Sequence, residues 1–190
     1  MTPILGIMAS SAMGSKQSSY ESIATATGTG SSNTITFSSI PATFKHLQIR
    51  GFYRDTYSGL DTSFALFVNF NSDTTNIYNA HRLQGNGTTV TALDDSRSGK
   101  FPIWYAGYST QTYTQVGGVS IMDILDYAST TKNKTVRTLS GVNDNTLGSN
   151  GVALQSALYR STNAITSVTL VADGTAFATN STFALYGIKG

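Results

Sequence analysis

Short runs of alternating apolar and polar residues, separated by clusters of turn formers, recur along almost the whole chain. Over residues 45–54, Leu47 and Ile49 point to one side of an extended chain, whereas Gln48 and Arg50 point to the other. A period of two predicts a strand with one buried and one wet face. The same pattern predicts further strands over residues 20–27, 33–38, 63–70, 77–84, 88–93, 101–106, 116–127, 134–142, 152–160, 165–172 and 182–188.

Three of these runs carry additional information. Residues 63–70 are apolar on one face and only weakly polar on the other, which predicts a central strand. Pro102 cannot donate to a sheet ladder, so residues 101–106 are expected to form an edge or bulged strand. Residues 116–127 are apolar enough to form a short helix, but their double glycine and Thr-rich flanks favour a strand.

Residues 165–190 predict two strands, 165–172 and 182–188, that pair with each other as a hairpin, because the loop between them holds Asp-Gly and Asn-Ser turn formers. The second strand is apolar on both faces, and a hairpin alone could not bury it. The rest of the chain is therefore expected to supply a second layer. About ten to twelve short strands predict an all-β fold, a jelly-roll-like antiparallel β-sandwich over residues 19–190.

Residues 1–18 begin apolar and become rich in Ser and Gly. A cleaved signal peptide is less well supported, since a charged n-region is missing and the apolar core is short. We expect an extended N-terminal arm that tethers the domain to a neighbouring subunit. The predicted anchoring residues are Ile4, Leu5, Ile7 and Met8.

Charge is sparse, at 12% of residues and a net +2, about half the usual charged share. Lys and Arg are scattered, which argues against a nucleic-acid partner. The densest basic run, Lys132-Asn133-Lys134, predicts the solvated start of a strand. The chain has no cysteine and no apolar run as long as a membrane span, so packing and hydrogen bonds must hold it together and no membrane insertion is expected.

Groups that could perform chemistry are few. His46 and His81 show no metal-ligand spacing, and Asp123 and Asp126 would point to opposite faces of a strand rather than form a carboxylate pair. Neither a nucleophile elbow nor a phosphate-binding loop is present in the sequence. We therefore predict no catalytic residue, no metal and no cofactor.

Aromatic residues with polar tips form the other candidate site. They cluster in the segment WYAGYSTQTY at 104–113 and around a second loop near residue 55. Such side chains are typical of sugar-binding and protein-binding surfaces, although they could instead pack on the rim of the sandwich. The candidate contact residues are Tyr53, Tyr57, Trp104, Tyr105, Tyr108 and Tyr113.

Four segments, at residues 35–55, 66–87, 120–142 and 165–190, together resemble small jelly-roll or β-sandwich proteins of tailed-bacteriophage virions, a group that includes tail-fibre, head-fibre and capsid-decoration proteins. The opening ILGIMASS is similar to the apolar leader of such domains. The resemblance implies a structural protein without enzyme activity, and a homo-oligomer, commonly a trimer, fixed to a capsid or tail.

The first expectation is thus a capsid decoration or cement protein on the outer surface of the virion, bound to the major capsid protein through its arm. The alternative is a tail-fibre or tail-associated module that binds host glycan through the aromatic segment. A polysaccharide depolymerase using Asp123 is the third possibility, and the scarcity of carboxylates argues against it.

Overall fold

The computed structural model describes residues 18–58, 62–109, 115–143 and 150–190, and it is all-β. The strands are β1 (Tyr20–Thr27), β2 (Thr34–Phe37), β3 (His46–Arg54), β4 (Thr62–Phe70), β5 (Tyr78–Gly85), β6 (Val90–Asp94), β7 (Phe101–Ser109), β8 (Gly118–Ile124), β9 (Lys134–Val142), β10 (Gly151–Tyr159), β11 (Val168–Ala172) and β12 (Thr182–Ile188).

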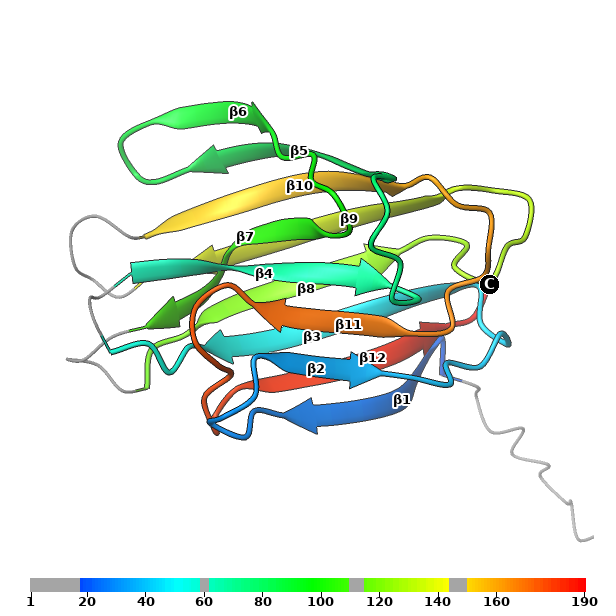
Figure 1. Ribbon diagram of the computed structural model, residues 1–190, viewed down its shortest axis with the longest axis horizontal. Coiled ribbons are helices and arrows are strands. Elements are labelled where there is room, and N and C mark those ends of the chain that lie inside the picture. Colours follow the sequence, from blue (N-terminus) through cyan, green and yellow to red (C-terminus); the bar gives the residue numbers. More distant parts are fainter. Residues whose placement is uncertain (1–17, 59–61, 110–114, 144–149) are drawn as a thin grey trace, which may run out of the picture.

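The strands form two layers (Figure 1). A large sheet has the order β1-β12-β3-β8-β9-β10-β5-β6, and a small sheet of order β2-β11-β4-β7 packs against one of its faces. The layers join where Tyr53 and Arg54 of β3 pair in parallel with Gly107 and Tyr108 of β7. Every other strand pair in the described chain is antiparallel. The predicted β-sandwich is confirmed.

The predicted terminal hairpin is wrong. β11 lies between β2 and β4 in the small sheet, whereas β12 lies between β1 and β3 in the large sheet. Between them, residues 173–181 cross from one layer to the other and are fixed by the buried carboxylate of Asp55, which accepts hydrogen bonds from the amides of Thr175 (2.9 Å) and Tyr57 (2.7 Å). The turn formers therefore make a crossover, since each strand has two other neighbours.

Three other predictions are confirmed. Residues 118–124 of the ambiguous apolar run form the strand β8, and β4 is central in the small sheet. β7 lies at the end of the small sheet and is bulged opposite β4, with Tyr105 at φ 51°. The bulge turns part of β7 away from regular pairing, which exposes its backbone to side chains of the other layer.

The core between the layers is rich in aromatic rings. Tyr78 and Tyr159 stack with centroids 5.0 Å apart, and Phe70 and Phe101 pack against them at 5.5 to 6.4 Å. The phenol of Tyr78 also accepts a hydrogen bond from the Phe70 amide at 3.0 Å. Such clusters combine large buried areas with a polar tip that needs a partner.

Candidate protein-binding face

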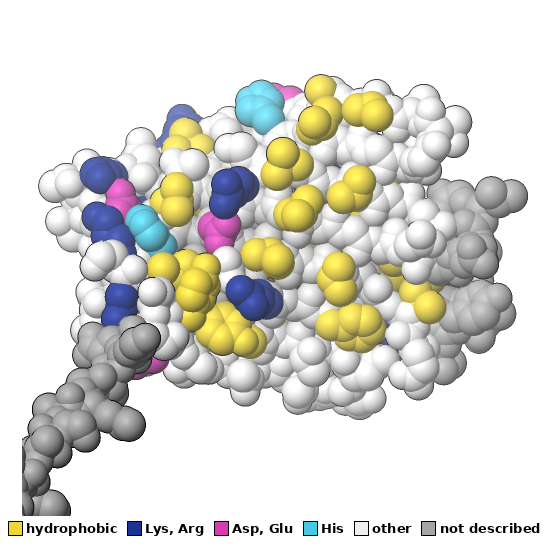
Figure 2. Space-filling model, turned by 180° about the vertical axis from the view of Figure 1, so that it is seen from behind, with side chains coloured by type: hydrophobic (Ala, Val, Ile, Leu, Met, Phe, Trp, Pro, Cys, Tyr) yellow, Lys and Arg dark blue, Asp and Glu magenta, His cyan; other side chains and the backbone are white. Residues whose placement is uncertain are grey.

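The outer face of the large sheet, which points away from the small sheet, carries a row of large aliphatic side chains (Figure 2). Strand register places these residues side by side on β8, β9, β10 and β5. Each is between 41% and 51% exposed. We call this row the ridge: it consists of Ile121, Leu139, Leu154 and Leu83.

A second row lies two residues along the same strands. In it, Val119, Val152 and Val90 on β8, β10 and β6 alternate with Gly141 and Gly85 on β9 and β5. The valines are 52% to 75% exposed. We call this the slotted row, because its glycines leave gaps between the valines. A hollow of about 310 Å³ lies between the slotted row and the ridge.

The opposite, inner faces of the same strands combine core residues such as Met122, Val136 and Tyr159 with polar side chains. Ser120, Thr138, Ser140 and Gln155 are all buried there, beneath β7. Ser140 Oγ donates to the Trp104 carbonyl at 2.5 Å, and Gln155 Nε2 donates to the Pro102 carbonyl. Ser140 and Gln155 thus satisfy backbone oxygens of the bulged strand. Over this part of β9 and β10, polar side chains are buried while Leu139 and Leu154 are exposed on the outer face.

A third row on the outer face carries charge in balanced pairs. Arg137 binds Asp123 at 3.0 Å, and Gln48 donates to the same carboxylate at 2.7 Å. Arg50 in turn donates to Gln48 at 2.7 Å and lies over the ring of Tyr186, 5.5 Å from its centroid. The carboxylate of Asp123 is therefore held by one side chain from each neighbouring strand, Gln48 on β3 and Arg137 on β9.

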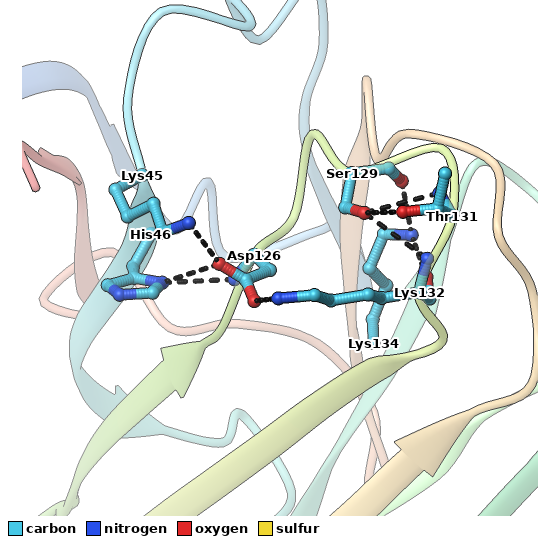
Figure 3. Close-up of polar contacts among 7 residues, drawn as sticks. All are labelled: Lys45, His46, Asp126, Ser129, Thr131, Lys132 and Lys134. Carbon is cyan, nitrogen blue, oxygen red and sulfur yellow. Dashed lines mark hydrogen bonds and ion pairs between the residues drawn. The ribbon is translucent and has the colours of Figure 1, made fainter.

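One end of this sheet holds a compact ionic cluster (Figure 3). Asp126 binds Lys132 at 2.8 Å and Lys45 at 3.0 Å, and these two ammonium groups lower its pKa to about 2. His46 Nδ1 accepts a hydrogen bond from the Asp126 amide at 3.0 Å, so this ring nitrogen carries no proton in the bond. His46 thus caps a turn.

Beside that cluster, the prediction of a solvated basic strand start is wrong for Lys134, whose side chain is fully buried. Its ammonium donates to the carbonyls of Ser129 and Lys132, both at 2.7 Å, and approaches those of Thr162 and Ser161 at 3.2 and 3.4 Å. Burial lowers the pKa of Lys134, and Asp126 opposes that effect. The side chain joins two loops.

The structure contradicts two of the aromatic contact predictions. Tyr53 and Tyr108 are completely buried, so neither can touch a partner at the surface. Tyr53 donates to Asp55 at 2.5 Å, and burial together with this carboxylate raises the pKa of Tyr53. Both residues lie where the two layers join, which explains their burial.

The other aromatic candidates do not form a shared open surface. Trp104 and Tyr105 are half-buried, and the Arg82 guanidinium already lies 4.2 Å from the Trp104 ring centroid. Tyr57 is 40% exposed and packs edge-on against Phe64. Outside the described residues lie Tyr113 and the arm residues Ile4, Leu5, Ile7 and Met8.

Within the part of the chain that the structure describes, His, Asp and Glu side chains do not gather in groups of three or more that could hold a metal ion. The described residues also include no helix long and apolar enough to cross a membrane. Comparison with protein-family models, with curated proteins and with solved structures finds no match to this chain. The ridge and slotted row are therefore judged on their geometry.

Proposed function

We propose that this protein is a structural subunit of a bacteriophage virion, which decorates the outer surface of the head through protein–protein contacts and performs no reaction. The observation that carries the proposal is the field of exposed large hydrophobic side chains on the outer face of the large sheet. Among the described residues, nine of the eleven exposed large hydrophobic side chains lie on its outer face, from Tyr20 at one edge to Val90 at the other. Scattered apolar residues are normal on a surface, but a contiguous field of them is typical of a binding surface.

The virion as the setting rests on the resemblance of the four segments to tailed-phage appendage proteins. A decorating subunit that binds only the assembled shell would stabilise that shell by mass action. In this proposal the arm, residues 1–18, contacts the major capsid protein, and the sandwich stands outward. A tail position with glycan binding is less favoured, because two of its candidate contact residues are buried.

Co-sedimentation with phage particles that lack this protein tests the proposal. The full chain should sediment with the particles, and deletion of residues 2–14 should abolish binding while the far-UV spectrum stays that of a β protein. The matched control is Thr36→Glu, on the exposed side of the small sheet. If the deleted chain decorates particles as fully as the intact one, the role of the arm is refuted; if the intact chain never binds particles, so is the proposed function.

A further inference from the structure

We infer that the partner of the outer face is a second copy of this chain, stacked face to face so that the ridge of each copy lies in the slotted row of the other. This inference rests on the proposed function, because it takes the outer face to be a protein-binding surface. It adds the identity of the partner and the symmetry of the contact.

The shape of the outer face of the large sheet is self-complementary. In a two-fold contact, residue i touches residue j and residue j touches residue i, so both halves of the fit must lie on one surface. Here the ridge and the slotted row lie side by side on the same strands. Val119 and Val152 are two strands apart, about 10 Å, with Gly141 between them. A leucine from the ridge of a second copy can enter that gap.

The folded chain by itself does not explain the glycine at position 85. A Cβ added there would meet no heavy atom closer than 3.9 Å, and Gly85 does not have a positive φ. Glycine inside a strand weakens it, and one of its established uses is to allow another chain to approach. The space above Gly85 can therefore accommodate a side chain of another chain.

Charge on the face favours a copy of the same chain over a strongly charged partner. Arg50 and Arg137 are balanced by Asp123 and Asp94, which strand register places on the same side of the sheet. Two such faces can meet without net repulsion. A nucleic acid or an anionic membrane surface would instead require a positive excess.

The available area is sufficient for a specific contact. The ridge and slotted row occupy β8, β9, β10, β5 and β6. Together with the charged row beside them, these five strands, about 4.8 Å apart, and the seven residues of β8, at about 3.3 Å each, give a face of about 550 Å². A pair of copies would bury about 1,100 Å², above the roughly 1,000 Å² expected of a biological interface, and the outer strands β3, β12 and β1 can add to it.

Sedimentation equilibrium of the full chain tests the inference. At concentrations on the order of 50 µM we expect twice the 20.1 kDa chain mass. The double variant Leu139→Asp, Leu154→Asp should weaken association by at least about 100-fold. Gly85→Thr, whose added Cβ would meet no heavy atom closer than 3.9 Å, should weaken it too, whereas Thr36→Glu should not. Gly85→Thr keeps the test decisive if the double variant fails to fold.

Because the chain has no cysteine, single introduced cysteines report the geometry. Mixed Val152→Cys and Leu154→Cys chains should form a disulfide under mild oxidation, and Thr36→Cys should not. A wild-type mass of one or three chains overturns the inference, as does cross-linking of Thr36→Cys to the same extent. If the wild-type protein is a monomer that binds particles, and the double variant does not bind them, the inference of a second copy is overturned and the proposed function stands. If the wild-type protein is a dimer that binds no particles, the inference stands and the proposed function is overturned.

Discussion

Replacement of Lys134 by methionine isolates the contribution of the buried ammonium. Methionine keeps the length and apolar stem of the side chain but leaves the carbonyls of Ser129, Lys132, Ser161 and Thr162 without their donor. Buried backbone oxygens that lose a partner destabilise the folded state. We therefore expect Lys134→Met to lower the free energy of unfolding.

The magnitude follows from the bond lengths. Two bonds of 2.7 Å are short enough to count fully, and hydrogen bonds to charged groups contribute about 1.5–3 kcal/mol each. The longer pair adds little, and removal of a buried charge recovers part of its desolvation cost. The net loss should be about 3 kcal/mol, similar to the loss of one partner of a buried ion pair. With a urea m-value of about 2–3 kcal/mol/M, the midpoint falls by about 1–1.5 M.

Urea titration followed by the fluorescence of the single tryptophan measures this shift. The matched control is Lys132→Met, whose side chain is 62% exposed and binds Asp126 at the surface. An exposed ion pair contributes about 0–1 kcal/mol, so its midpoint should move by less than about 0.5 M. A Lys134→Met midpoint no lower than that of Lys132→Met would refute the argument that the ammonium joins the two loops.

Three further predictions concern stability. The folded-state pKa of Asp126 is about 2, against 3.8 for the unfolded chain, so its contribution to folding stability is complete above pH 3.8 and is lost as the pH falls through about 2. The difference in urea midpoint between wild type and Asp126→Asn should therefore shrink between pH 5 and pH 2, and a constant difference would contradict this. Gly174→Ala places a Cβ 2.5 Å from the carboxylate of Asp55, so the crossover loop must shift at a cost of about 1–3 kcal/mol. Gly85→Ala, whose Cβ would meet nothing closer than 3.9 Å, should lower the thermal midpoint far less, and equal midpoints for the two variants would show that the crossover is not tightly held. Tyr53→Phe removes the donor to a buried carboxylate and should cost about 1–3 kcal/mol in the same thermal assay.

Local sequence pattern was sufficient for most of the fold. The predicted ranges 20–27 and 134–142 coincide with β1 and β9, because alternation and turn residues both act over short distances. Which strands pair with one another could not be predicted from local pattern. Residues 165–172 and 182–188 are close in sequence and separated by good turn formers, yet Asp55, far away in the chain, holds their connection in a different path.

The exposed aliphatic face was missed because alternation gives the two faces of a strand but does not say which face is inside. In β10, Val152 and Leu154 alternate with Ala153 and Gln155, and the apolar pair would normally be assigned to the core. The structure does the opposite, since Gln155 is needed under β7 as a donor to its backbone. The available signal was the small size of Ala153 and Ala157, which suits the closely packed side of a strand beneath another layer.

The neighbour of β1 in the large sheet is β12, and the Lys189 amide donates to the Ser19 carbonyl at 3.0 Å. β1 therefore has no strand to pair with until β12, which lies close to the last described residue, has been synthesised. Contacts between such distant segments slow folding, so the pairing of β1 with β12 is expected to be a late step in folding. If residues 1–18 act as the anchor that we propose, this topology delays attachment to a particle until the domain is whole.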